Sequence, residues 1–296
     1  MTFYDTLPGA LEWLVRLALF AAVCGAVLLH FVMEPVRWKL AYLDRAQGPA
    51  QAGRVRDILF CTTVATYIFP FKIGLPLRMG LLNRLAAMNV RFIGTVLAVD
   101  GLISLAVWVL AAIVCVWLGA FQWQPPVYVW VGAGVMLAVL IGLGVRRKWA
   151  SGGSAPWSQA LALFRDPWRR MSWAGAILLL DVSLYWLRHA LLVLLVTGQM
   201  TWALAGGSAG LVATFAGIIS GLPMGLLGYD ASLLALLGAA GVPIGDIITI
   251  ITLNRALNIG MAVMLGIPAG IRLGIGTGLV GILRKLKDIG SGKERP

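Results

Sequence analysis

Long apolar runs cover most of the chain. Five of them approach or exceed the roughly 17 to 25 residues that a helix needs to cross about 30 Å of hydrocarbon. They lie at 9–33, 92–119, 127–145, 173–197 and 244–267. The pattern predicts an all-α polytopic membrane protein. The first run carries Glu12 and Arg16 and is too long for the apolar core of a signal peptide, so we expect it to be retained as a span.

Two further apolar runs, 58–71 and 202–222, are interrupted by prolines and glycines. Proline removes a backbone donor and clashes with the preceding helical turn, so neither segment is expected to continue as one regular helix. Short helices are predicted to follow at 81–89 and 231–240. Each segment is therefore predicted to form a broken or re-entrant helical hairpin, with its free backbone groups satisfied by protein or water. The breaks are marked by Pro70, Gly74, Pro76 and Gly80 in the first segment and by Pro223, Gly225 and Gly228 in the second.

Lysine and arginine gather in the short segments beside the apolar runs: after the first span, at 146–148 and in the tail. Short cytoplasmic loops are enriched in these residues, so the basic segments are predicted to be cytoplasmic, with the N-terminus outside and the C-terminus inside. The two hairpins then open to opposite sides, as in an inverted repeat. We expect five to six full spans plus the two hairpins. A bundle with unrelated proline and glycine kinks is the alternative.

A polar stretch at 148–170 divides the chain, which is predicted to be a single transmembrane domain, 1–296. The first half covers about 1–147, the cytoplasmic linker 148–170 and the second half about 171–270, followed by a basic amphipathic tail, 271–296. Residues 35–42 mix apolar and basic side chains. They predict either a short interfacial helix or an ordinary loop.

Composition agrees with this picture and excludes several functions. Hydrophobic residues make up 60% of the chain and charged residues 12%, which is unlike a soluble domain. The net charge of +12 is explained by the loops beside the spans, so nucleic acid is not expected as a partner. The three cysteines stand singly and His30 and His189 are far apart, so no metal or other cofactor is predicted. Motifs of hydrolases and ATP-binding loops are absent from the sequence, and we expect no enzyme activity.

Ionisable residues inside apolar runs are candidates for a binding site because charge at membrane depth is costly. Cations outnumber anions near the first break, which favours an anionic head group as ligand. Internal pairing is the alternative: Arg255 with Asp230 or Asp100, and Arg188 with Asp181. The predicted substrate-binding residues are Lys72, Arg78, Asp100, Asp230, Asn254 and Arg255.

The interrupted segments resemble the lysylphosphatidylglycerol synthase transmembrane family, a flippase-like domain. The resemblance covers about residues 10–270 and implies a protein that moves lipid. Members that make aminoacylated lipid carry a C-terminal synthase domain, whereas this chain ends at Pro296 and resembles a stand-alone member. The matching residues are Pro70, Gly74, Pro76, Arg78 and Gly80, the stretch from Leu222 to Asp230, Leu253-Asn254-Arg255 and Leu265-Gly266.

These features together predict a lipid translocase of a bacterial-type inner membrane. Its cargo is expected to be a polar-headed phospholipid or a polyprenyl-phosphate-linked lipid. A non-transporting membrane partner of an envelope-lipid or glycan-lipid enzyme is the alternative. The expected partners are accordingly a membrane lipid or, in the second case, such a biosynthetic enzyme.

Overall fold

The computed structural model describes residues 3–43, 49–68, 74–117, 167–220 and 227–275. Within these ranges the chain is helical and has no strand. Four helices are long and apolar enough to cross a membrane. They agree with four of the five predicted full spans, and the fifth, 127–145, lies outside the described residues. The four are α1 (Gly9–Arg37), α4 (Val90–Trp117), α7 (Pro167–Thr197) and α10 (Ile244–Arg272).

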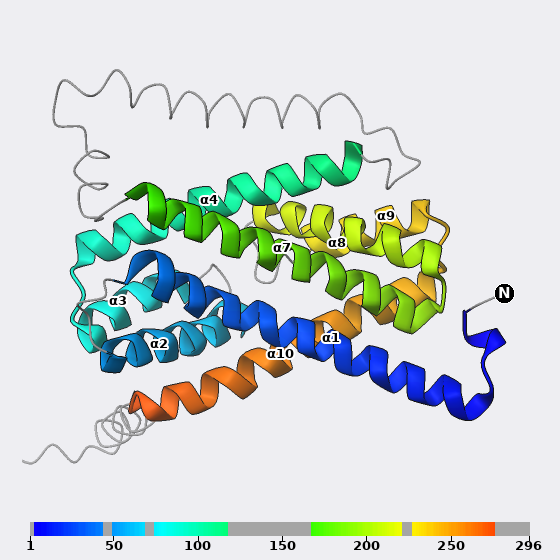
Figure 1. Ribbon diagram of the computed structural model, residues 1–296, viewed down its shortest axis with the longest axis horizontal. Coiled ribbons are helices and arrows are strands. Elements are labelled where there is room, and N and C mark those ends of the chain that lie inside the picture. The colour runs from blue at the N-terminus through cyan, green and yellow to red at the C-terminus, as the bar shows by residue number, and fades with distance from the viewer. Residues whose placement is uncertain (1–2, 44–48, 69–73, 118–166, 221–226, 276–296) are drawn as a thin grey trace, which may run out of the picture.

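Two pairs of shorter helices stand where the interrupted segments were predicted. The first pair is α2 (Pro49–Ile68) with α3 (Gly74–Ala86), and the second is α8 (Met200–Ser220) with α9 (Gly228–Ala239). The two helices of each pair pack against each other. Figure 1 shows α2 and α3 gathered toward the left end of the long helices, and α8 and α9 toward the right end.

The first short helix begins earlier than the sequence predicted. Pro76 and Gly80 lie inside α3, so the predicted start at residue 81 and the assignment of these two residues as breaks are wrong. Pro76 is the third residue of α3. In the first turn of a helix the backbone N–H groups have no intrahelical acceptor, so the N–H that proline lacks is not missed by the helix. Gly74 opens α3 and Gly228 opens α9. Pro70, Pro223 and Gly225 lie outside the described residues.

Gly74 also permits a close contact within the first hairpin. A Cβ atom at this position would collide with the side chain of Thr66 and come within 2.9 Å of the carbonyl oxygen of Thr62. Glycine therefore lets the start of α3 lie directly against α2.

Residues 35–42 form neither an interfacial helix nor a loop, so both predictions for this segment are wrong. Helix α1 continues to Arg37, and a π-helical turn, Trp38–Tyr42, extends it. Trp38 and Tyr42 are buried in a hydrophobic cluster with residues of α2, α3 and α4. Burial of these large side chains outweighs the amphipathic pattern. The extension brings Glu34 and Arg37 into the bundle.

Small residues let the long helices approach one another. Helix α7 packs along α1 and α8, and α10 packs along α2. A Cβ atom at Gly206, Gly207 or Gly210 of α8 would collide with side chains of α7, and one at Gly266 of α10 would collide with Val64 of α2. Close backbone approach through small residues is typical of helix packing in membranes.

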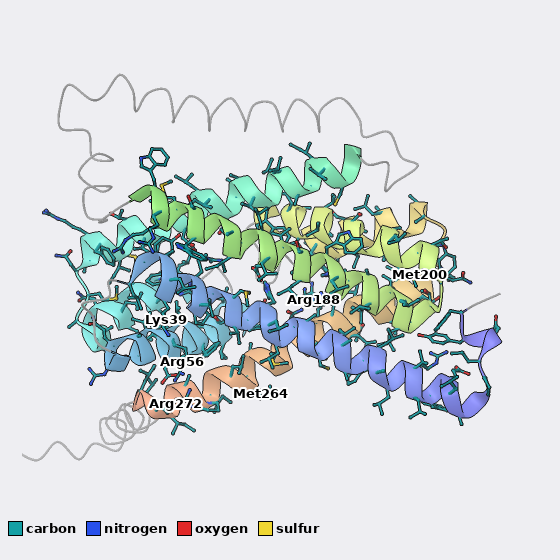
Figure 2. The ribbon with its side chains drawn as sticks, viewed as in Figure 1. Lys39, Arg56, Arg188, Met200, Met264 and Arg272 are labelled. Atoms are coloured by element: carbon teal, nitrogen blue, oxygen red, sulfur yellow. The ribbon has the colours of Figure 1, made fainter. Side chains whose placement is uncertain are left out.

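Basic residues gather at one end of the bundle. Lys39, Arg56 and Arg272 lie at one end and Met200 at the other (Figure 2). At the basic end, Arg272 of α10 donates hydrogen bonds of 3.0 and 2.9 Å to the two carboxylate oxygens of Asp57 in α2. This ion pair fixes the end of α10 to the first hairpin.

Candidate functional site

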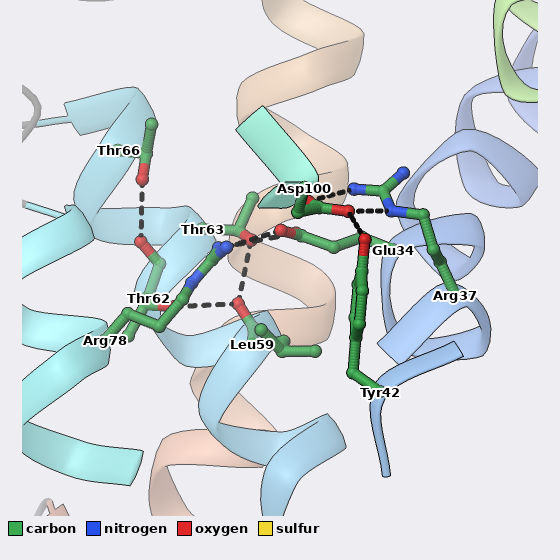
Figure 3. Close-up of polar contacts among 9 residues, drawn as sticks. All are labelled: Glu34, Arg37, Tyr42, Leu59, Thr62, Thr63, Thr66, Arg78 and Asp100. Atoms are coloured by element: carbon green, nitrogen blue, oxygen red, sulfur yellow. Dashed lines mark hydrogen bonds and ion pairs between the residues drawn. The ribbon is translucent and has the colours of Figure 1, made fainter. Parts of the chain in front are cut away.

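A buried ion pair joins α1 to α4, and a partly buried one joins α1 to the first hairpin (Figure 3). Arg37 donates from Nε to Asp100 Oδ1 at 2.7 Å and from Nη2 to Asp100 Oδ2 at 2.9 Å. The hydroxyl of Tyr42 donates to the same carboxylate at 2.8 Å. Both oxygens of Asp100 therefore accept hydrogen bonds. Such a bidentate pair is the strongest hydrogen-bonded arrangement of an arginine and a carboxylate.

A second pair lies beside the first. The guanidinium of Arg78 in α3 binds the carboxylate of Glu34 in α1, with Nη1–Oε1 at 2.5 Å and Nη2–Oε2 at 3.3 Å. Arg78 Nε donates to the hydroxyl of Thr62 in α2 at 3.1 Å. The cation that the sequence singled out for a phosphate ligand is thus compensated within the protein. We call Glu34, Arg37, Tyr42, Thr62, Arg78 and Asp100 the first polar cluster.

The second polar cluster consists of Arg188, His189, Tyr229, Asn254 and Asn258, from α7, α9 and α10. His189 Nδ1 lies 2.9 Å from the carbonyl oxygen of Tyr185, which can only accept, so Nδ1 carries the proton. In the neutral ring Nε2 then accepts from the hydroxyl of Tyr229 at 2.7 Å. That hydroxyl in turn accepts from the side-chain amide of Asn254 at 2.9 Å.

The same chain of hydrogen bonds continues to Arg188. The Asn258 amide donates to the backbone oxygen of Asn254 at 2.6 Å and to its side-chain oxygen at 3.1 Å. Asn258 Oδ1 accepts from Arg188 Nη1 at 3.0 Å. Every acceptor between Arg188 and the Tyr185 carbonyl is therefore an uncharged group.

Two more side-chain contacts decide the alternatives that the sequence left open. Arg255 Nη2 lies 2.5 Å from Asp230 Oδ2, so Asp230 is its partner. The predicted pairing of Arg188 with Asp181 is wrong, because Asp181 lies 2.6 Å from His30 Nδ1 in α1. Arg188 and Asp181 are seven residues apart on α7, about 10 Å along its axis.

The structure brings the predicted site residues into three places. Arg78 and Asp100 belong to the first polar cluster, Asn254 belongs to the second, and Asp230 pairs with Arg255. Lys72 lies outside the described residues.

Sequence reasoning missed several polar residues of these clusters. Glu34 and Arg37 were assigned to the polar segment after the first span, although a spacing of three places them on one helical face. Tyr229 lies beside the predicted Asp230, but it is uncharged and so was not among the charged residues considered for a site. Other polar residues that were not predicted as site residues are His30, Tyr42, Thr62, His189 and Asn258.

An apolar groove of about 330 Å³ lies between α4, α7 and α8. Tyr185, whose backbone carbonyl ends the second polar cluster, belongs to the hydrophobic cluster behind this groove. Two members of that cluster, Val182 and Leu211, line the groove. The groove is lined by Val107, Leu110, Ala111, Val114, Cys115, Leu179, Val182, Ser183, Trp186 and Leu211.

Among the described residues, no group of three or more histidine, cysteine and acidic side chains could hold a metal ion. The polar interior consists of arginine, carboxylate, amide, hydroxyl and imidazole groups. Such groups can bind and orient a polar ligand through hydrogen bonds and charge.

Apolar spans around buried ion pairs define a polytopic α-helical membrane protein. The chain belongs to the family of the lysylphosphatidylglycerol synthase TM region, whose model matches residues 6–266. The family is membrane-associated and flippase-like. The match confirms the family that the interrupted segments resembled. No curated protein and no solved structure matches the chain.

Proposed function

We propose that the protein is a lipid translocase of the inner membrane. In this proposal a polar head group passes through the polar interior while the hydrocarbon chains stay in the bilayer. The cargo is a polar-headed phospholipid or a polyprenyl-phosphate-linked lipid. Membership of a flippase-like family supports the proposal.

The observation that carries the proposal is the succession of buried polar groups across the bundle. On α1, His30 and Glu34 stand one turn apart, and on α7 Asp181 and Arg188 stand two turns apart. The first polar cluster, the His30–Asp181 pair and the second polar cluster therefore follow one another along the long helices. A bundle that only had to be stable would favour apolar side chains at such positions, because ionisable groups are expensive in the membrane.

We further propose that the two halves form an inverted repeat. Helices α2, α3 and α4 have 20, 13 and 28 residues, and α8, α9 and α10 have 21, 12 and 29. The cross-contacts match as well, since α10 packs on α2 and α4 packs on α8. The placement of the two hairpins toward opposite ends of the long helices in Figure 1 supports opposite entry into the membrane.

The charges of the two halves have opposite signs at corresponding places. Helix α3 carries the cation Arg78 and α4 the anion Asp100, whereas α9 carries the anion Asp230 and α10 the cation Arg255. In the second half these two residues pair directly. In the first half, α1 supplies a separate counter-charge to each. A rearrangement in which the charged residues of the two hairpins change their ion-pair partners would open the site to one side of the membrane at a time. Alternating access requires such a change.

Reconstitution in vesicles tests the proposed transport. Fluorescent phospholipid is placed in both leaflets, and its outer-leaflet fraction is destroyed chemically. The wild-type protein is expected to expose the inner-leaflet label to the reagent, whereas protein-free vesicles protect it. The charge-swapped double variant D230R/R255D retains a pair of opposite charges. It is expected to keep more transport activity than D230R alone. Folded wild-type protein without any exchange would instead favour a non-transporting partner of a lipid enzyme.

A further inference from the structure

Arg188 is a buried cation without a carboxylate partner among the described residues. Its exposed fraction is 1%, and Figure 2 places it in the middle of the bundle. Within the same part of the chain, each interior carboxylate is bound by another residue. The pairs are Glu34 with Arg78, Asp57 with Arg272, Asp100 with Arg37, Asp181 with His30 and Asp230 with Arg255.

The contacts of Arg188 leave part of its hydrogen-bonding capacity unused. Nη1 donates to Asn258, and the guanidinium lies 4.0 Å from the centre of the Tyr185 ring. Nε is buried and has no hydrogen-bond partner among the described residues. The chain of hydrogen bonds that starts at Asn258 contains only uncharged groups, so it delivers no negative charge to Arg188.

An unpaired guanidinium at this position is costly. Arginine does not lose its proton in proteins, so the charge cannot be removed as it can for a lysine or histidine. Removing such a charge from water costs several kcal/mol, which only an opposite charge with good hydrogen bonds offsets. The bundle supplies that compensation to Arg37, Arg78 and Arg255. At Arg188 none of the described residues supplies it, which points to a ligand as the source of the counter-charge.

We propose that Arg188 binds the phosphate of an anionic lipid during transport. A guanidinium offers parallel N–H donors that match two phosphate oxygens, and the buried Nε is one such donor. This inference rests on the proposed function and narrows the cargo to lipids with a net negative head group. A zwitterionic lipid would carry its own cation into the site and compensate Arg188 less well.

The apolar groove supplies the matching place for a hydrocarbon chain. The ring of Tyr185 contacts Arg188, and it also contacts Trp108 at 5.0 Å between ring centroids. Tyr185 shares a hydrophobic cluster with Val182 and Leu211, which line the groove. In this proposal a lipid tail in the groove packs against the cluster that contains Tyr185, whose ring in turn contacts Arg188.

Binding of short-chain lipids to the purified full-length chain tests the site without transport. Dihexanoyl phosphatidylglycerol is compared with dihexanoyl phosphatidylcholine by calorimetry. The wild-type protein is expected to bind the anionic lipid at least tenfold more tightly. R188Q should lose this preference, and R16Q, which changes a partly exposed arginine paired with Glu12, should keep it. Equal preference in R188Q and wild type would overturn the inference.

A second variant retains the arginine and supplies the missing charge. N258D places a carboxylate where Asn258 Oδ1 now accepts from Arg188. It should abolish the preference for phosphatidylglycerol, because Arg188 is then compensated, although the carboxylate cannot replace the two hydrogen bonds that the Asn258 amide donates to Asn254. A folded N258D protein that binds the anionic lipid as the wild type does would also overturn the inference.

The vesicle assay separates this inference from the proposed function. With labelled phosphatidylglycerol and phosphatidylcholine, the wild-type protein should move the anionic lipid faster, and R188Q should remove the difference. Binding that depends on Arg188 without any leaflet exchange would refute transport and support the anion site. Exchange in which R188Q keeps the wild-type preference for phosphatidylglycerol would support transport and refute the anion site.

Discussion

The carboxylate of Glu34, near the end of the first span, binds the guanidinium of Arg78, which lies 44 residues later in the first hairpin. Arg78 is the cation that the sequence offered most plainly to a phosphate. Because Glu34 already compensates it, Arg78 is best regarded as part of the hairpin's attachment to α1. The free cation of the described interior is Arg188, one face of whose guanidinium lies over Tyr185.

Replacement of Asp100 by asparagine should destabilise the protein more than loss of any exposed charge. The variant leaves the guanidinium of Arg37 buried without a counter-charge, and breaking a buried pair in this way costs about 3 to 5 kcal/mol. Thermal or denaturant unfolding in detergent measures the effect.

The matched control for D100N is E12Q, which breaks a partly exposed pair on one helix. It should cost less than about 1 kcal/mol. In the double variant D100N/R37Q, the loss should be smaller than the sum of the two single losses, because neither charge is left alone. Additive losses would mean that the two side chains do not interact as the structure describes.

A methyl group at Gly210 should loosen the contact between α7 and α8. The added Cβ would collide with the ring of His189, which is held on both sides by hydrogen bonds. We expect G210A to lose about 1 to 3 kcal/mol, as overpacked positions do. G238A is the control, because a Cβ there meets no atom within 4 Å. Equal melting temperatures for the two variants would contradict the packing of α8 on α7.

Removal of one hydroxyl should break the second polar cluster. Y229F deprives the Asn254 amide of its acceptor and His189 of its donor, both at buried positions. An unsatisfied buried polar group costs about 1 to 3 kcal/mol. The loss is measured by unfolding in detergent, and the double variant Y229F/N254L should recover part of it. No recovery would indicate that the hydroxyl is held by other groups.

Much of the fold could be predicted from the apolar runs, because length and hydrophobicity alone decide which helices can cross a bilayer. The start of α10 at Ile244 and the end of α7 at Thr197 are confirmed. The boundaries of α3 were less accessible. Pro76 and Gly80 indicate a break by local rules, but a proline in the first helical turn is harmless.

The partners of the buried charges could not be predicted in the same way. Arg188, on the same helix, was the alternative partner for Asp181, which instead lies beside His30 from α1. Pairing depends on which faces of separate helices pack together. Local patterns in a single sequence do not show which faces these are. Arg37 illustrates the same point, since burial of Trp38 and Tyr42 converts a basic stretch that resembled a loop into part of the first span.

Opposite entry of the two hairpins can be tested by cysteine labelling from each side of the membrane. Arg84 lies near the end of α3 and Gly245 near the start of α10, and both are exposed. In a chain whose native cysteines are replaced, R84C should react with an impermeant reagent only from the cytoplasmic side and G245C only from the outside. Labelling of both from one side would exclude the inverted arrangement.

Leaflet exchange of labelled phosphatidylglycerol by the wild-type protein in vesicles tests the proposed transport most directly. The exchange rate is measured against protein-free vesicles and against vesicles with G238A, which should match the wild type. Lipid transport predicts exchange that rises with the number of protein molecules per vesicle, and the anion site at Arg188 predicts that this exchange falls in R188Q. A rate equal to that of protein-free vesicles, with the wild-type protein shown to be folded, would contradict it.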